Sequence, residues 1–302
     1  MSTVLLLESI HEDAHQILAQ QSTVVTAEYN PTAVDAIITR GKGQVNADLI
    51  HQLPNLKVIA RCGVGLNNVD LESARAKGLE VLNTPGLNAA TVAEHTIGLM
   101  LMLQRQLYRN IAATKQGDWQ IRNQYGGDEL RGKTLGILGM GDIGQRVAKI
   151  ATALEMNVVY WNRSAKDVYY DRLSLENVLI DSDIISIHLP LTEETRYLLD
   201  QEKLALCHRN VLIINTARAE IIEPNALLEA LQNDKIKGYA ADVPRSQSNI
   251  EKQLYTLDQV LLTPHIASLT ARTYRDICVT SAVNVLAFLS GEEVNGRFRA
   301  LR

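Results

Sequence analysis

The 302-residue sequence has few cysteines and no run of charge of one sign. Its three cysteines, Cys62, Cys207 and Cys278, are far apart and form no Cys-x-x-Cys pair, which argues against a disulfide framework or a zinc site. The 30 basic and 34 acidic residues are mixed along the chain, so no basic stretch suits nucleic acid or an anionic membrane. We therefore expect reduced, mostly buried thiols, no metal site, no nucleic-acid partner and no membrane partner.

Long hydrophobic runs are also missing. No segment reaches the roughly 20 apolar residues of a membrane-spanning helix, and the run from Val4 to Leu7, ended by Glu8, is too short for a signal peptide. These absences favour a cytoplasmic protein that acts on a small soluble ligand. The chain exceeds the usual size of a single hydrophobic core, so two domains are expected.

Short apolar, β-branched segments alternate with helix-length amphipathic segments along the whole chain. This alternation is typical of an α/β protein with parallel sheets covered by helices. In the first hundred residues the predicted strands are 3–7, 23–28, 36–39, 57–61 and 80–82. In the remainder they are 135–138, 157–161, 184–188, 211–215, 237–241 and 260–262.

Two predicted helices bear on the domain organisation. The segment from residue 91 to about 115 predicts one continuous helix, and its two-sided hydrophobicity indicates a domain junction or a subunit contact. The helix predicted for residues 271–289 has no following strand, so we expect it to pack back onto the first domain and make that domain discontinuous. The predicted domains are residues 1–96 plus 270–302, and residues 97–269.

A glycine-rich turn is the most informative local feature. Gly139, Gly141 and Gly144 follow a predicted buried strand, and a helix pattern begins at Asp142 and Ile143. One glycine permits the tight turn, one admits phosphate against bare backbone, and one lets the helix pack closely. Such a triplet alone also fits an ordinary turn, but between a strand and a helix it predicts binding of a dinucleotide pyrophosphate at the helix N-terminus.

The next strand ends in Asn162-Arg163-Ser164, where an NAD-selective site would carry an acid for the adenosine ribose. Neutral Asn162 tolerates a 2′-phosphate, and Arg163, helped by Ser164, can pair with it. The sequence thus favours NADP, with NAD as the alternative. A solvated charge at the strand end is the other interpretation of Arg163.

Three further segments follow predicted strands and contain Arg218, Asp242 and His265. Ligands of open α/β sheets bind beyond the carboxyl ends of the strands, so these side chains should converge near the nicotinamide. In contrast, His95, on the long predicted helix, is expected to serve packing or a subunit contact.

With these residues in hand, the chain resembles the D-isomer-specific 2-hydroxyacid dehydrogenase family, especially phosphoglycerate dehydrogenases and hydroxypyruvate or glyoxylate reductases. Besides the glycine turn, the matching motifs are RCGVGLNNVD (61–70), NTP (83–85), AEH (93–95), HLPLTEET (188–195), NTARAEIIE (215–223) and PH (264–265). The resemblance implies two Rossmann-like doubly wound parallel-sheet domains with a cleft between them. It also implies a homodimer that transfers hydride between NAD(P)H and a small 2-oxo acid or D-2-hydroxy acid.

The resemblance assigns roles that the chemistry of the side chains supports. Arg218 holds the substrate carboxylate and polarises the carbonyl with its rigid fork of donors. The backbone N–H groups of Val64 and Gly65 hold the other carboxylate oxygen, and His265 is the acid and base for the hydroxyl proton. Asp242 holds the nicotinamide carboxamide. The other residues expected to line the cofactor are His188, Pro190, Thr195, Thr216 and Ala217.

Arg61 and Gln247 bear on the substrate preference and on the pH dependence of the expected activity. Arg61 precedes the Gly-x-Gly turn, where it can hold a distal phosphate or carboxylate, so a 3-phosphoglycerate-like or dicarboxylic substrate is favoured slightly over hydroxypyruvate and glyoxylate. The family's glutamate that pairs with the histidine is replaced by Gln247, with Glu251 the nearest alternative acid. A carboxamide can orient His265 without stabilising its charge, so activity should fall off at lower pH than in glutamate-bearing relatives. The alternative function is a weakly catalytic or non-catalytic NAD(P)(H)-sensing binding protein.

Overall fold

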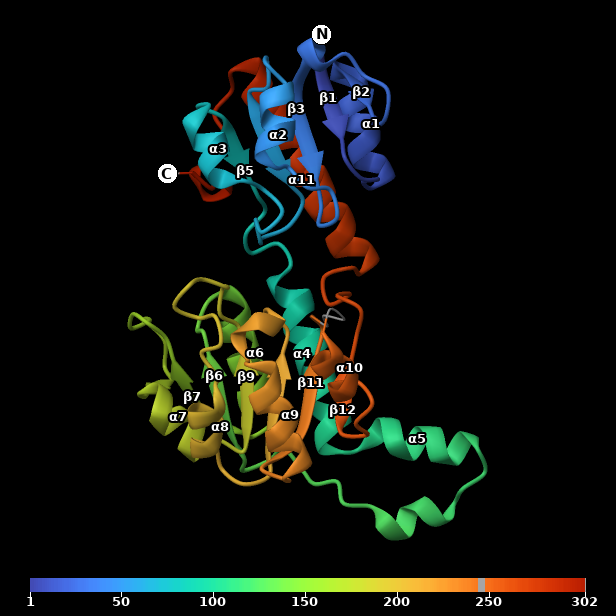
Figure 1. Ribbon diagram of the computed structural model, residues 1–302, viewed down its shortest axis with the longest axis vertical. Helices are drawn as coiled ribbons and strands as arrows, with labels where there is room; N and C mark the ends of the chain where they lie inside the picture. Colours follow the sequence, from blue (N-terminus) through green and yellow to red (C-terminus); the bar gives the residue numbers. More distant parts are fainter. Residues whose placement is uncertain (244–247, 302) are drawn as a thin grey trace. The chain divides into compact units, whose positions relative to one another are not determined.

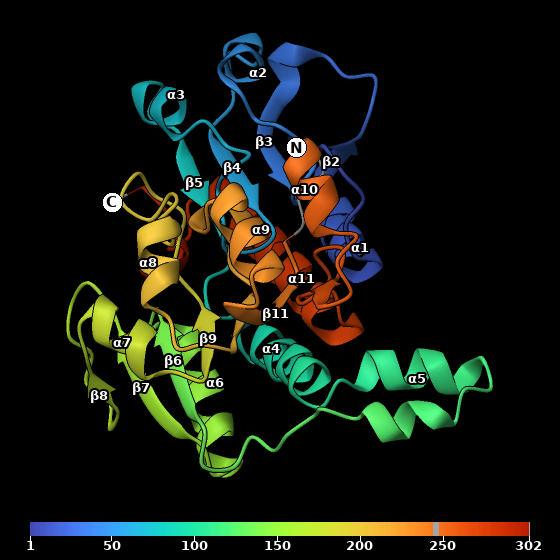
Figure 2. The same cartoon turned by 60° about the horizontal axis from the view of Figure 1, so that its bottom comes forward.

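The computed structural model describes residues 1–243 and 248–301, and the chain divides into two compact units (Figures 1 and 2). Unit 1 contains Met1–Asn88 and Leu269–Arg302, and unit 2 contains Ala89–Ser268. Each unit is a parallel β-sheet covered by helices, which confirms the expected α/β class with two Rossmann-like domains. The domain limits expected from the sequence stay a prediction.

Unit 1 contains a five-stranded parallel sheet in the order β2-β1-β3-β4-β5. Its central strands are buried on both faces, which explains their nearly unbroken apolar sequences. The strands are β1 (Ser2–Leu6), β2 (Ser22–Val25), β3 (Val34–Thr39), β4 (Val58–Arg61) and β5 (Glu80–Leu82). The helices are α1 (Glu12–Gln21), α2 (Ala47–Gln52), α3 (Leu71–Ala76) and α11 (Ala271–Ser290), with short 3-10 turns at Pro31–Ala33 and Gly296–Phe298.

Successive strand residues of unit 1 point to two separate cores. Val4 and Leu6 of β1 pack with α1 and α11, whereas Leu5 packs with α2 and α3 on the opposite face. As expected, the last long helix therefore belongs with the first domain. Cys62 and Cys278 lie in the α11 core, and all three cysteines of the chain are buried, free thiols.

Unit 2 contains a seven-stranded parallel sheet in the order β12-β11-β10-β9-β6-β7-β8. The strands are β6 (Thr134–Leu138), β7 (Asn157–Trp161), β8 (Asp171–Arg172), β9 (Ile184–Ile187), β10 (Val211–Asn215), β11 (Ile236–Ala241) and β12 (Val260–Leu262). The chain runs outward from β6 to β8 and then returns to add β9 beside β6. This reversal is the topological switch point, where doubly wound sheets bind their ligands.

Helices cover both faces of the unit 2 sheet. One core joins the sheet to α4 (Ala89–Gln104) and α6 (Asp142–Ala153). The opposite core joins it to α7 (Leu175–Asp181), α8 (Gln201–Leu206), α9 (Pro224–Gln232) and α10 (Asn249–Leu254). None of the described helices is long and apolar enough to cross a bilayer.

The single helix predicted for residues 91–115 is wrong, because the structure breaks it into α4 and α5 (Leu107–Lys115). Gln106, between them, has a left-handed backbone with φ 48°, and the Gln104 carbonyl at the end of α4 accepts from the Asp128 amide. No glycine or proline marks the break, so the sequence carried no local signal for it. Beyond the break, α5 and the 3-10 turn Gln120–Gln124 extend away from the sheet of unit 2 (Figures 1 and 2).

A half-buried carboxylate organises the loop after β3 in unit 1. Glu8 Oε1 accepts from the backbone N–H groups of Arg40, Gly41, Lys42 and Gly43 at 2.8 to 2.9 Å. Burial raises the pKa of Glu8, but these amides and the Thr39 hydroxyl lower it, and the net pKa lies below the ordinary value of 4.5. The ionised form is therefore the one that the fold prefers.

Replacing Glu8 should destabilise unit 1 in a pH-dependent way. We expect Glu8→Gln to lower the free energy of unfolding by about 1 kcal/mol at pH 7, because a carboxamide oxygen accepts these bonds without charge. A carboxyl group whose pKa is lower in the folded than in the unfolded state contributes its full stabilisation above the unfolded pKa, 4.5 for Glu8, and loses it as the pH falls through the folded pKa. Urea unfolding at pH 7 and pH 4 should thus show a smaller difference at pH 4. The exposed control Glu28→Gln should change stability by less than about 0.5 kcal/mol at both, and an equal effect of Glu8→Gln at both pH values would contradict the assignment.

Candidate functional site

The glycine turn lies at the switch point of unit 2, between the ends of β6 and β9. Gly139 has a φ of 104°, and a Cβ there would lie 2.7 Å from the His188 carbonyl oxygen. A Cβ on Gly144 would collide with the Gly139 carbonyl, whereas the space beside Gly141 is open. The three glycines thus provide the turn, the close helix packing and the bare backbone that a pyrophosphate requires.

Helix α6 begins directly at this turn. Its first residue, Asp142, is exposed and Ile143 is half-buried, while its N-cap residue is Gly141, which has no side chain to satisfy the first amides. The N-terminus of this 12-residue helix therefore directs backbone N–H groups and the positive end of its dipole toward the open side of the turn. These residues fit a dinucleotide pyrophosphate.

The ribose end of the site is tied to the same turn. Asn162 Oδ1 accepts from the Met140 amide at 3.1 Å, and Asn162 Nδ2 donates to the Ser164 carbonyl at 2.9 Å. Arg163 is exposed, and its Nη1 lies 3.2 Å from Glu194 Oε2. No local sequence pattern indicates this carboxylate, which comes from a loop that is remote in sequence.

The loop after β9 contains the other predicted cofactor contacts. His188 Nε2 lies 2.8 Å from Ser186 Oγ, and burial lowers the pKa of His188 to about 3, so this imidazole is neutral at physiological pH. Thr195 Oγ1 donates to the Pro190 carbonyl at 2.6 Å and accepts from the Thr192 amide at 2.8 Å. Thr195 therefore shapes the turn that begins at Pro190.

The turn after β10 carries Arg218 and is held by Asn215, a residue to which the sequence analysis gave no role. Asn215 is fully buried; its Nδ2 donates to the Arg218 carbonyl at 2.9 Å and its Oδ1 accepts from the Ala217 amide at 3.0 Å. Thr216 Oγ1 lies 3.0 Å from Thr96 Oγ1 on α4. Burial lowers the pKa of Arg218, but a guanidinium stays charged under all physiological conditions.

The loop after β12 carries His265 and is held by Asp242 at the end of β11. Asp242 is 1% exposed; its Oδ1 accepts from Thr263 Oγ1 at 2.6 Å and from the Ile266 amide at 2.8 Å. Its Oδ2 accepts from the Ala267 amide at 2.8 Å. His265, between these contacts, is exposed and has a φ of 59°, a conformation that non-glycine residues seldom adopt.

Strands β10, β11 and β12 are neighbours in one parallel sheet, so Arg218, Asp242 and His265 follow the same carboxyl edge. Gln247 lies outside the described residues. His95, which the sequence analysis assigned to packing or a subunit contact, instead has its Nε2 3.0 Å from Thr263 Oγ1. No local pattern joins residues so distant in sequence, and this contact was therefore missed.

The predicted substrate contacts of unit 1 lie in a preformed turn after β4. Gly63 has a φ of 133°, and a side chain there would collide with the Arg61 guanidinium, which folds over it and donates to the Cys62 carbonyl. Asn83 Nδ2 donates to the Val64 carbonyl at 2.9 Å and the Thr84 amide donates to the Gly63 carbonyl at 2.9 Å, so the Gly65 and Val64 N–H groups of the same two peptides point the opposite way. Gly65 is the second glycine of this turn.

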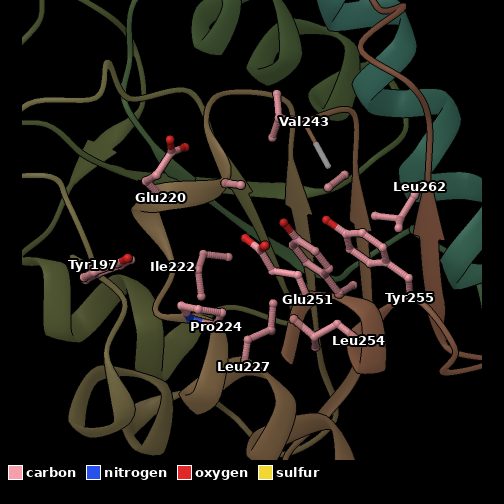
Figure 3. Close-up of a pocket in the computed structure, with 13 residues that line it drawn as sticks. Tyr197, Glu220, Ile222, Pro224, Leu227, Val243, Glu251, Leu254, Tyr255 and Leu262 are labelled. Atoms are coloured by element: carbon pink, nitrogen blue, oxygen red, sulfur yellow. The ribbon is translucent and has the colours of Figure 1, made fainter. Parts of the chain in front are cut away.

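An apolar pocket of unit 2 lies among α9, α10 and β11 (Figure 3). Its described lining contains none of the predicted cofactor or catalytic residues. Glu251 lies in it, and Glu251 Oε2 accepts from the Ser248 amide at 3.0 Å while Ser248 Oγ accepts from the Glu251 amide at 3.1 Å. This reciprocal pair caps α10, so the acid nearest to Gln247 in sequence has a structural role.

Comparison with known proteins agrees with this geometry. Residues 97–267 match the family described as "D-isomer specific 2-hydroxyacid dehydrogenase, NAD binding domain". The chain belongs to the D-isomer-specific 2-hydroxyacid dehydrogenase family. Its sequence is 40% identical to a hydroxypyruvate reductase of Thermotoga maritima over 249 residues, which is 81% of each chain. It is 35% identical to a D-3-phosphoglycerate dehydrogenase of Methanocaldococcus jannaschii, covering 97% of this chain and 58% of that protein.

A solved structure leads to the same family. D-lactate dehydrogenase from Aquifex aeolicus, crystallised with NAD and lactic acid, superposes with a TM-score of 0.89 at 26% identity, covering 100% of this chain and 99% of that one. The chain is therefore an NAD-dependent 2-hydroxyacid oxidoreductase, which confirms the expected family, fold and enzyme class. The alternative of a non-catalytic sensing protein is not favoured.

Proposed function

We propose that the chain interconverts small 2-oxo acids and D-2-hydroxy acids, with hydroxypyruvate, glyoxylate and 3-phosphoglycerate-like acids as the substrate class. The observation that carries this proposal is the placement of Arg218 and His265 at one edge of the sheet that also holds the glycine turn. The bound nicotinamide cofactor supplies the hydride. In the reverse direction the oxidised cofactor would accept the hydride of the D-2-hydroxy acid, and His265 would take the hydroxyl proton.

In this proposal the residues of the chain divide the work of the reaction. Arg218 binds the substrate carboxylate and polarises the 2-oxo group through two donors of one rigid fork. His265 donates a proton to the oxygen that becomes the hydroxyl, and Gln247 orients its ring. The amides of Val64 and Gly65 hold the second carboxylate oxygen, and Arg61 holds a distal anionic group.

The proposed cofactor site extends from the glycine turn to the loops after β9, β10 and β11. The first amides of α6 bind the pyrophosphate, and Asp242 holds the nicotinamide carboxamide. The remaining proposed contacts are Asn162, Arg163, Ser164, His188, Pro190, Thr195, Thr216 and Ala217. Asn162 and Thr195 act by shaping their turns, through the bonds of Asn162 Oδ1 to the Met140 amide and of Thr195 Oγ1 to the Pro190 carbonyl.

Turnover of a panel of 2-oxo acids tests the proposal directly. We expect NADPH or NADH oxidation with hydroxypyruvate or glyoxylate, and His265→Ala should lower kcat about 10²- to 10⁴-fold, the usual contribution of a general acid. Arg218→Lys should raise KM and lower kcat, because an ammonium cannot imitate the bidentate fork. The exposed control His208→Ala should match the wild type. Wild-type protein that turns over none of these acids, or a fully active His265→Ala, would refute the proposal.

We further propose that the chain prefers NADP(H), with NAD(H) also accepted. The strand end lacks an acid, and the Asn162 side chain is directed to the glycine turn, so the exposed Arg163 is free to exchange Glu194 for a 2′-phosphate. An ion pair between such exposed side chains is weak, so its exchange costs little.

Variants of Arg163 and of Glu194 can show separately how each charge affects the binding of NADPH and NADH. Arg163→Ala should raise KM for NADPH about tenfold and leave KM for NADH nearly unchanged, because only NADPH carries the 2′-phosphate. Glu194→Gln should lower KM for NADPH, since it removes the competing carboxylate. Initial rates at varied cofactor concentration measure KM for NADPH and for NADH. An equal increase of both KM values in Arg163→Ala would exclude a 2′-phosphate contact.

We also propose a homodimer that forms through the segment 107–127 of unit 2. Helix α5 has no buried residue, and large apolar side chains of the segment face solvent, including Ile111 at 51% and Trp119 at 72% exposure. Leu107 and Tyr125 add to this exposed apolar surface. Such a surface on an extended segment is typical of a protein interface.

Sedimentation velocity tests the dimer. The wild type should sediment as a dimer at micromolar concentration, and Ile111→Ser combined with Trp119→Ser should shift it toward the monomer, because both changes remove apolar area from the interface. The double variant Arg122→Ser with Lys115→Ser, which changes polar residues of the same segment, is the matched control. A monomeric wild type would rule the dimer out.

A further inference from the structure

A chain of polar side chains connects helix α4 to the loop that carries His265. His95 Nε2 on α4 lies 3.0 Å from Thr263 Oγ1, and Thr263 Oγ1 donates to Asp242 Oδ1 at 2.6 Å. His95 Nε2 is also 3.6 Å from that carboxylate oxygen. The three residues come from α4, from the loop after β12 and from the end of β11.

The chemistry of the three groups fixes the direction of these bonds. A threonine hydroxyl has one proton, and Thr263 gives it to the Asp242 carboxylate, which can only accept. Thr263 Oγ1 is then left as an acceptor toward the imidazole, so His95 Nε2 carries the hydrogen. His95 therefore donates to Thr263, and Thr263 donates to Asp242.

Asp242, the last acceptor in this series of hydrogen bonds, fixes the backbone around His265. Besides Thr263, Asp242 accepts from the amides of Ile266 and Ala267, and the His265 amide donates to the Thr263 carbonyl at 3.0 Å. His265 thus has fixed contacts before and after it in sequence. A left-handed conformation such as its φ of 59° persists only where the surroundings hold it.

We propose that His95 and Thr263 are positioning residues, which fix the Asp242 carboxylate and through it the loop that presents His265 to the substrate. The inference rests on the proposed role of His265 as the acid. In this proposal His95 supports the reaction indirectly, because its described contacts are with Thr263 and Asp242 and not with His265 or the Arg218 turn.

A second contact of α4 supports this task. Thr96, the next residue, donates to the Val92 carbonyl at 2.8 Å and so accepts from Thr216 Oγ1 at 3.0 Å, on the loop that carries Arg218. Two successive residues of one buried helix therefore contact the loops of both proposed reactive side chains. Because α4 is packed against the sheet core, it is a rigid reference for both loops.

The test compares Thr263→Val, which keeps the shape and removes the hydroxyl, with Thr263→Ser, which keeps the hydroxyl. We expect Thr263→Val to lower kcat about 10- to 100-fold, since misplacing an acid affects the chemical step. Thr263→Ser should recover at least about a third of kcat. The exposed control Thr256→Val should match the wild type.

A double-mutant cycle asks whether His95 acts through Thr263. His95→Leu alone should lower kcat, His95→Gln should retain more activity because its amide can donate, and His95→Leu with Thr263→Val should be no slower than the slower single variant. Additive losses, or a Thr263→Ser variant as slow as Thr263→Val, would overturn the proposal. Melting temperatures of all variants identify any that fail to fold.

Hydrogen exchange of the Ile266 and Ala267 amides gives a readout that does not depend on turnover. Both amides should exchange faster in Thr263→Val and His95→Leu than in the wild type and in Thr256→Val, because their acceptor is no longer fixed. Unchanged exchange in both variants would overturn the positioning role. A fully active His265→Ala would instead refute the proposed acid, and faster exchange would still support control of the loop by His95 and Thr263.

Discussion

The arrangement at the carboxyl edge of unit 2 depends on one buried charge. A carboxylate that is 1% exposed is stable only when its oxygens accept hydrogen bonds, and Asp242 obtains three, all from the loop after β12. The need to satisfy that charge fixes how the loop folds back over β11. The position of His265 is therefore a consequence of satisfying Asp242, and the unusual backbone of His265 is held by bonds on both of its sides.

The same physical solution recurs at other strand ends. Loops at the carboxyl edge of a parallel sheet leave backbone amides and carbonyls without ladder partners, and these groups need partners wherever they are buried. Asn215 supplies both an acceptor and a donor to the turn of Arg218, and Glu8 supplies one oxygen to four amides in unit 1. Polar side chains at strand ends thus decide the shape of these loops, including those of the proposed reactive residues.

The sequence predicted the features whose causes are local. Strands β7, β10 and β12 have the predicted bounds, because each appears in the sequence as a short, mostly apolar run. The glycine turn was recognisable because each glycine answers a local steric demand. Strand β8 consists of two residues, both exposed, and the helix break at Gln106 has no glycine or proline. Neither feature therefore produces a recognisable pattern in the sequence. The contact of His95 with Thr263 joins residues 168 positions apart, and only tertiary structure brings them together.

The position and the acid strength of His265 are under separate control in this chain. Its backbone is held by the contacts that join Asp242, Thr263 and the amides of the loop. By the resemblance, the family pairs this histidine with a glutamate that favours its protonated form, and this sequence has Gln247 at that position. Exchanging an acid for an amide removes a charge that favours imidazolium, but it does not disturb the bonds that set the backbone. The substitution can therefore move the pH range of proton transfer while the geometry that Arg218 and His265 require is preserved.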